Sequence, residues 1–199
     1  MDSHSMPVGP AAATGPRYHF RDPRGAALVA QCFLACSAIA DVYVIATGGA
    51  ESPWVKEDEI LLAAWLQLAC WFSFLFWFYR CRRNAEAIAP GSHKWTPAFA
   101  LGAWIIPLAM WWVPRRIALD IHRAGGPPRD AWLINAWWCV WLVDGPVSVA
   151  VHLLILHQTD YHTPVDHALA ILDSILAIAV IRRVTAGQAA GPLSYVTMT

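Results

Sequence analysis

Residues 60–79 read ILLAAWLQLACWFSFLFWFY, contain no charged side chain and are followed at once by Arg80, Arg82 and Arg83. A helix of this length rises by about 30 Å, which matches the hydrocarbon core of a bilayer. Arginines directly after such a run are typical of the point at which a spanning helix leaves the membrane. The stretch therefore predicts a membrane-spanning helix.

Three further apolar stretches, at residues 26–46, 131–156 and 164–181, are also long enough to cross a bilayer. The composition agrees, since 57% of the 199 residues are hydrophobic, only 14% are charged and 12 are tryptophans. A water-soluble domain of this size cannot bury so much apolar surface. We therefore predict an all-α fold, a polytopic transmembrane helix bundle with four spans.

Residues 95–114 are uncharged as well, but Pro97, Gly102 and Pro107 weaken a regular helix there. If this segment crosses, the Lys and Arg residues divide equally between the two sides. If it is re-entrant or lies in the interface, all of them except Lys56 share one side, as the positive-inside rule favours. We therefore predict four spans plus a proline-bent re-entrant or interfacial segment, with five spans as the alternative. Both termini are then cytoplasmic, in a multi-pass protein of the inner cell membrane.

The domain organisation follows from these spans. Residues 1–24 are rich in Gly, Pro, Ala and Ser and predict a disordered cytoplasmic tail, residues 25–186 form the transmembrane domain, and residues 187–199 are a C-terminal tail. The 14 basic residues balance the 14 acidic ones, which argues against nucleic acid as a partner. The expected partner is the lipid bilayer.

The connection between the second and third spans is rich in tryptophan. Indole rings favour the headgroup level, so we expect a cytoplasmic-side aromatic belt that includes Trp95, Trp104, Trp111, Trp112, Trp132, Trp137 and Trp138. Residues 115–124 predict a short amphipathic helix, with Ile117, Ala118 and Ile121 on the apolar side.

Several short motifs resemble those of a known family. The fragment Phe78-Tyr79-Arg80-Cys81-Arg82-Arg83-Asn84-Ala85-Glu86 is similar to the YR-x-RRNAE signature of an actinobacterial membrane family, the domain of unknown function four-three-two-eight. Further matches follow in order at Gly102-Ala103-Trp104-Ile105-Ile106-Pro107, Asp120-Ile121-His122-Arg123-Ala124, Asn135-Ala136-Trp137-Trp138-Cys139-Val140-Trp141-Leu142 and Ile181-Arg182-Arg183-Val184-Thr185-Ala186-Gly187-Gln188. The resemblance implies a bacterial integral membrane protein and transfers no reaction.

Three acids lie inside predicted spans: Asp41, Asp144 and Asp173. Charge at the bilayer centre is costly, so such residues usually face the bundle interior and mark a functional site. Helix rise places all three in the middle to outer half of the bundle, and Gly145-Pro146 should bend the third span beside Asp144. We expect an acidic intramembrane pocket in which the three are candidate catalytic acids. Alternatively, they only hydrogen-bond neighbouring helices, with about 0.6 kcal/mol per bond.

Four histidines recur at every fifth position across the end of the third span and the start of the fourth: His152, His157, His162 and His167. Imidazole suits zinc or copper, which makes these residues weak candidates for a metal site. Their spacing does not keep to one helix face. We therefore predict no cofactor and keep zinc or copper as the less favoured alternative.

Three classes of function remain open. The first is a scaffold or interaction subunit that binds a membrane protein partner. The second is a membrane-embedded enzyme on a lipophilic, isoprenoid-like substrate, with Asp144 or Asp173 as general acid. The third is a proton or metal-ion conduit. The sequence contains no G-x-x-x-x-G-K-[ST], G-x-S-x-G or H-E-x-x-H motif to support phosphate-loop, serine-hydrolase or zincin chemistry.

Overall fold

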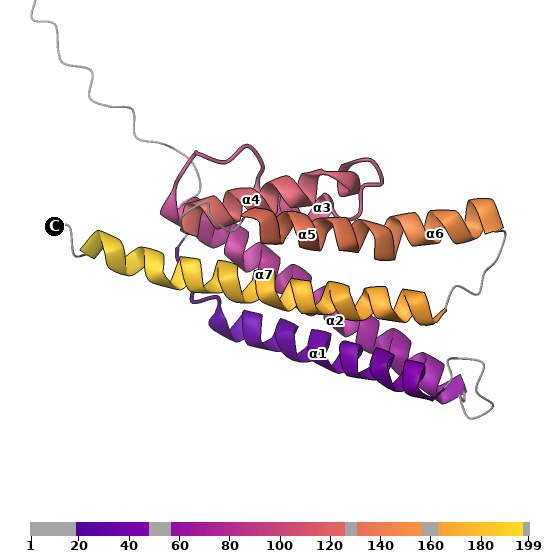
Figure 1. Ribbon diagram of the computed structural model, residues 1–199. Helices are drawn as coiled ribbons and strands as arrows, with labels where there is room; N and C mark the ends of the chain where they lie inside the picture. The colour runs from indigo at the N-terminus through magenta and orange to yellow at the C-terminus, as the bar shows by residue number, and fades with distance from the viewer. Residues whose placement is uncertain (1–18, 48–56, 126–130, 157–162, 197–199) are drawn as a thin grey trace, which may run out of the picture.

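The computed structural model describes residues 19–47, 57–125, 131–156 and 163–196. Helices, and no strands, make up the regular structure of these residues (Figure 1). In chain order the elements are α1 (Arg24–Ala46), α2 (Glu57–Ile88), α3 (Pro97–Gly102), the 3-10 turn η1 (Ala109–Trp111), α4 (Val113–Gly125), α5 (Ala131–Leu142), the π turn η3 (Val143–Val147), α6 (Ser148–Val151), the π turn η4 (His152–Leu156) and α7 (Pro164–Val196).

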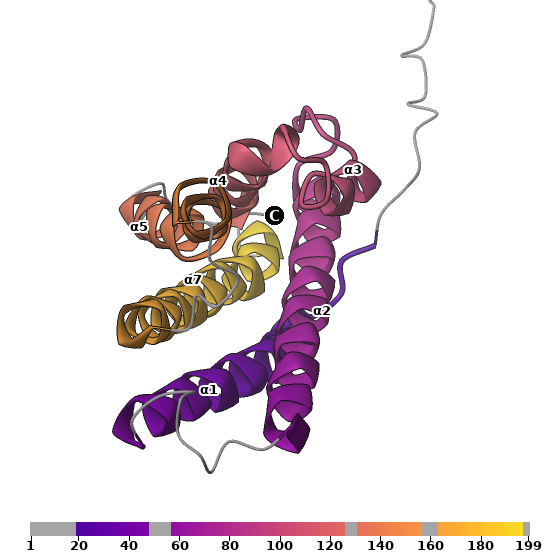
Figure 2. The same ribbon diagram turned by 90° about the vertical axis from the view of Figure 1, so that its right-hand side faces the viewer.

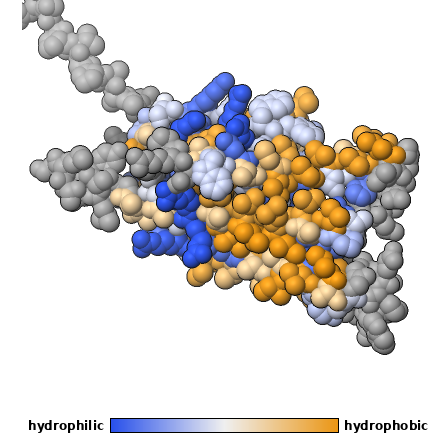
Figure 3. Space-filling view, viewed as in Figure 1, coloured by the Kyte–Doolittle hydropathy of each residue, from blue (hydrophilic) through white to orange (hydrophobic). Residues whose placement is uncertain are grey.

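Four helical segments are long and apolar enough to cross a membrane, namely Arg24–Ala46, Leu61–Ile88, Ala131–Ile155 and Pro164–Ala190. They confirm the predicted all-α bundle with four spans. Many of their large apolar residues face outward. Examples on α2 are Leu62, Trp65 and Phe72, each of which has more than two-thirds of its surface exposed. Figure 3 shows this hydrophobic surface as a broad band, with hydrophilic side chains gathered at one end of the bundle. The bundle is thus built to face lipid around its middle.

The segment between the second and third spans is broken into short pieces, as its prolines predict. Thr96 caps α3 by accepting a hydrogen bond from Phe99 N at 3.2 Å, and Pro97 occupies the first turn, where a missing N–H is tolerated. The chain turns after Gly102 and reforms only the single turn η1 before α4. Within the part of the chain that the structure describes, this segment adds no fifth spanning helix.

The amphipathic helix predicted at residues 115–124 is α4. Its apolar side is buried through Ile117, Ala118 and Ile121, and it contacts α2, α5 and α7. On the exposed side, Arg123 and Asp120 form an ion pair at 3.1 Å.

The third span is interrupted at the predicted position. Pro146 has no N–H to donate and its ring crowds the preceding turn, so the regular hydrogen-bond pattern cannot pass through it. The chain widens into the π turn η3 at Val143–Val147, resumes as α6 and widens again at η4. Asp144 lies inside the first of these turns.

Helix α7 lies at the centre of the arrangement. It packs between α1 and α5 and also contacts α2 and α4 (Figure 2). Near its C-terminal end, a Cβ atom on Gly187 would come within 2.9 Å of the carbonyl oxygen of Gly125, so the glycine permits close approach of α4. The helix continues to Val196 and therefore includes most of the segment predicted as a C-terminal tail. The predicted N-terminal tail lies largely outside the described residues.

Candidate functional site

One short polar contact between spans joins α1 to α7. His167 Nδ1 lies 2.8 Å from Asp41 Oδ1, and both side chains are largely shielded, with 13% and 18% of their surfaces exposed. An ionised carboxylate only accepts hydrogen bonds, so in that state the imidazole donates from Nδ1. The pair places a carboxyl and an imidazole group in direct contact between two spanning helices.

A second set of polar contacts joins α6 to the start of α7. Ser148 Oγ donates to Asp166 Oδ1 at 3.2 Å, and Thr163 donates to Asp166 Oδ2 from its hydroxyl at 2.6 Å and from its backbone N–H at 3.0 Å. His152 Nδ1 lies 2.9 Å from the carbonyl oxygen of Ser148. Thr163 and Asp166 thereby cap the first turn of α7, which explains why the helix begins there.

The two remaining candidate acids are Asp144 in η3 and Asp173 on α7. Asp144 is within electrostatic range of Asp41 and Asp166, and Asp173 is within range of Asp144. Both are half-buried. Asp173 Oδ1 is buried and has no hydrogen-bond partner among the described residues. The structure therefore brings Asp41, Asp144 and Asp173 to one region, which we call the acid–imidazole cluster together with His167, Asp166 and His152.

Sequence reasoning found part of this cluster. It identified the three acids, His152 and His167. It missed the pairing of His167 with Asp41, because the two are 126 positions apart and only the packing of α1 on α7 joins them. Of the four candidate histidines, His152 contacts the carbonyl oxygen of Ser148 and His167 contacts Asp41. His157 and His162 lie outside the described residues. Within those residues, no group of three or more potential metal ligands occurs.

The prediction of an aromatic belt is wrong for three of its tryptophans. Trp104, Trp137 and Trp138 are only 2–3% exposed and form the core between α2, the connecting segment and α5. The Trp104 ring makes edge contacts with Phe74, Phe78 and Trp141 at centroid distances of 5.3–5.6 Å. Trp111, Trp112 and Trp132 are exposed, as expected. Edge-to-face packing around Trp104 therefore contributes to a buried core and not to an exposed belt.

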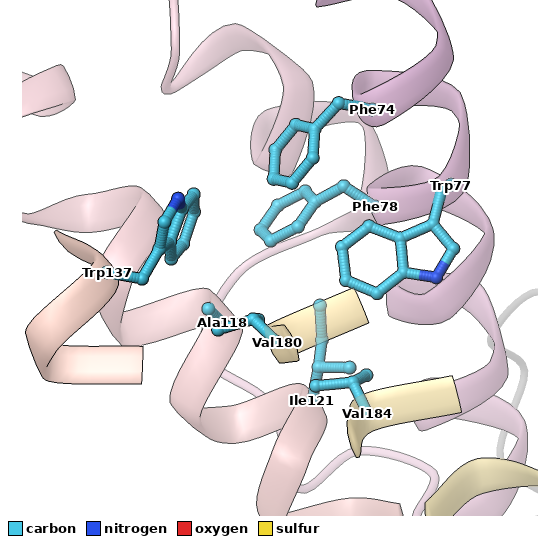
Figure 4. A pocket seen from close by; sticks show the side chains of 8 residues that line it. All are labelled: Phe74, Trp77, Phe78, Ala118, Ile121, Trp137, Val180 and Val184. Carbon is cyan, nitrogen blue, oxygen red and sulfur yellow. The ribbon is translucent and has the colours of Figure 1, made fainter. Parts of the chain in front are cut away.

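A small cavity beside this core contains no acid. It has a volume of about 10 Å³, at the lower limit of what one water molecule needs. Figure 4 shows its lining of aromatic and aliphatic side chains, namely Phe74, Trp77, Phe78, Ala118, Ile121, Trp137, Val180 and Val184. The aromatic core is therefore a filled structural element, separate from the acid–imidazole cluster.

The motif at the end of α2 holds helix ends together. Asn84 accepts from Arg21 N at 3.0 Å, donates to Arg21 O at 2.8 Å and to Gln188 Oε1 at 3.2 Å, while Gln188 donates to Cys81 O at 2.8 Å. One turn earlier, Trp77 donates to Thr185 Oγ1 at 3.1 Å.

Two further residues of the motif fix the connecting segment. Arg82 pairs with Glu86 at 3.0 Å and donates to the carbonyl oxygen of Trp95. The first and the last of the family-like motifs thus meet at one end of the bundle, through residues 82–86 and 185–188. Sequence reasoning recognised these residues without giving them this structural role.

Comparisons with known proteins agree with this picture. A family model described as Domain of unknown function (DUF4328) matches residues 52–186. The comparisons with curated proteins and with solved structures gave no match. Because the family model covers well over half of the 199 residues, the chain belongs to the DUF4328 family.

Proposed function

We propose that this integral membrane protein relays protons through its acid–imidazole cluster. The observation that carries the proposal is the 2.8 Å contact between His167 Nδ1 and Asp41 Oδ1 inside spanning helices. Carboxyl and imidazole groups within spanning segments are the usual components of proton relays. Asp144 and Asp173 extend the set toward α5 and the middle of α7.

We further propose the orientation in the inner membrane. Arg24 at the start of α1, Arg83 near the end of α2 and Arg182 on α7 lie toward the same end of the bundle, which we call the basic end. The positive-inside rule assigns such an end to the cytoplasm. The acid–imidazole cluster then lies in the half of the bundle that faces the outside.

Proton flux into vesicles tests the relay. The full-length protein is reconstituted into liposomes that contain a pH-sensitive dye, and a potassium diffusion potential drives protons inward. We expect faster acidification than in empty liposomes, and its loss in Asp41→Asn and in His167→Gln. Asp120→Asn is the matched control, because Asp120 forms its ion pair on the surface of α4.

A wild-type protein that acidifies vesicles no faster than empty liposomes would contradict the relay. The Asp41–His167 pair would then be an interhelical tie in a scaffold or interaction subunit. In that case Asp41→Asn should lower stability and disrupt assembly with a membrane protein partner.

A second candidate is an enzyme acting on a lipophilic substrate in the membrane. The observation that favours it is Asp173 Oδ1, which is buried without a hydrogen-bond partner in the described part of the chain. A carboxylic acid kept neutral in such a position is a hydrogen-bond donor and a proton source for general acid catalysis. If Asp173→Asn abolishes the function of the protein in cells and Asp41→Asn leaves that function intact, the enzyme is favoured over the relay.

A further inference from the structure

A pocket at the basic end is separate from the acid–imidazole cluster. It has a volume of about 70 Å³ and lies between one face of α2 and the short segment that leads into α1. From α2 it is lined by Phe76, Tyr79, Arg80 and Arg83, which share one helix face by their spacing. We call it the basic pocket.

The segment before α1 forms the wall opposite α2, and hydrogen bonds to its backbone hold it in place. His19 and Arg21 line the pocket from the segment before α1. Asn84 binds both the N–H and the carbonyl oxygen of Arg21, at 3.0 and 2.8 Å, which fixes the backbone that carries the Arg21 side chain. The Arg21 side chain therefore starts from an ordered position although the residue is exposed.

The charge in the pocket is unbalanced. Among the residues that the structure describes, its lining contains three arginines and no acid. Arg82, which lies on the other side of α2 and does not line the pocket, pairs with Glu86. Arg80 Nε is buried and has no hydrogen-bond partner among the described residues. A buried guanidinium N–H without an acceptor is costly, and an anion with several oxygens relieves that cost.

The position of the pocket identifies the anion. Arg80 follows directly on the apolar run of α2, and Arg21 precedes the first residue of α1, so the arginines lie where two spans enter the headgroup region. Phe76 lies one turn closer to the bilayer centre and is 59% exposed, so it offers an apolar surface beside the charge. The Arg83 guanidinium lies 5.8 Å from the centre of the Tyr79 ring, which orients it.

We propose that the basic pocket binds the phosphate of an anionic phospholipid, with Arg21, Arg80 and Arg83 on the phosphate and Phe76 beside an acyl chain. Basic pockets between spanning helices at the membrane surface are a known way of binding anionic headgroups. The interaction holds the N-terminal segment against α2 from the lipid side, as Asn84 does from the protein side.

Native mass spectrometry of the full-length protein in detergent micelles tests this assignment. The protein is titrated with dioleoylphosphatidylglycerol, with dioleoylphosphatidylcholine and with soluble glycerol phosphate. We expect one phosphatidylglycerol to bind at least about fivefold more tightly than phosphatidylcholine, and Arg80→Gln to remove most of that preference. Arg182→Gln is the matched control, because Arg182 is exposed on α7 and does not line the pocket.

Arg21→Gln is a second variant that should not impair folding, because the Arg21 side chain is exposed and precedes α1. It should also reduce phosphatidylglycerol binding. Equal affinity for the two lipids would overturn the proposal, and so would equal losses in Arg80→Gln and Arg182→Gln. Glycerol phosphate binding as tightly as phosphatidylglycerol would assign the pocket to a free phosphate instead.

Discussion

His167 and Asp41 join the last spanning helix to the first, with 2.8 Å between the imidazole Nδ1 and the carboxyl Oδ1. The same two helices pack against each other, so the pair lies within an existing helix–helix contact. A polar contact in this position serves stability whether or not it also moves protons. Its energetic and functional contributions therefore have to be measured separately.

A double-mutant cycle measures the energetic part. Asp41→Ala and His167→Ala should each destabilise the bundle, and the double variant should lose less than the sum of the two. We expect a coupling energy between about 0.6 and 1.7 kcal/mol, the average and the maximum found for interhelical hydrogen bonds in a membrane protein. Reversible unfolding in mixed micelles provides the measurement. Strictly additive losses would show that the contact contributes nothing of its own.

The close approach of α4 to α7 depends on Gly187. A methyl group there would come within 2.9 Å of the backbone carbonyl oxygen of Gly125, which cannot move aside as a flexible side chain can. Gly187→Ala should therefore destabilise the protein by about 1–3 kcal/mol, the usual cost of overpacking. Gly102→Ala is the control, since a Cβ at Gly102 meets no atom within 4 Å. Equal unfolding temperatures for both variants would contradict the expected clash.

The polar contacts of Asn84 should stabilise the protein although the residue lies near a helix end. Asn84 is 1% exposed and binds the backbone of Arg21 and the side chain of Gln188, so Asn84→Ala leaves several partners unsatisfied. We expect a loss of about 1–3 kcal/mol in the free energy of unfolding. In the control Gln31→Ala, the lost hydrogen bond reaches only the backbone of the same helix. A loss no greater than that of the control would argue against a structural role of the motif.

The spans could be predicted because each depends on neighbours in sequence. An uncharged run such as residues 60–79 must be helical to satisfy its backbone in lipid. The break at Pro146 was equally local, since proline disrupts the helix wherever the helix packs. The pairing of Asp41 with His167 and of Asn84 with Gln188 could not be found in this way, because both depend on which helices become neighbours.

Trp104 shows a different limit of the sequence. Tryptophan is common both in interfacial belts and in packed cores, so its position beside the membrane boundary did not distinguish the two. Only the surrounding rings of Phe74, Phe78 and Trp141, from two other helices, make Trp104 a core residue.

Removing the central ring tests that assignment. Trp104 is 3% exposed and touches rings of α2 and α5, so Trp104→Ala should cost about 3–5 kcal/mol. Trp132→Ala, at a residue that is 64% exposed, should change the free energy of unfolding by much less. A blue-shifted tryptophan fluorescence should also decrease more in Trp104→Ala than in Trp132→Ala. Equal changes of stability and fluorescence in the two variants would contradict the assignment of Trp104 to the core.

The charges of the bundle predict its orientation, and fusion reporters determine it directly. Ala124 lies near the end of α4, and the described segment between α2 and α4 contains no helix long and apolar enough to span a membrane. We therefore expect a reporter fused after Ala124 to share its side with one fused after the last residue. Both should be active as cytoplasmic reporters, since the arginines at the ends of α2 and α7 favour that side. A reporter after Thr47, at the far end of α1, should lie on the opposite side. Opposite sides for Ala124 and the C-terminus would require a fifth crossing, which the broken helix at residues 97–111 could provide only by leaving backbone groups unsatisfied in lipid.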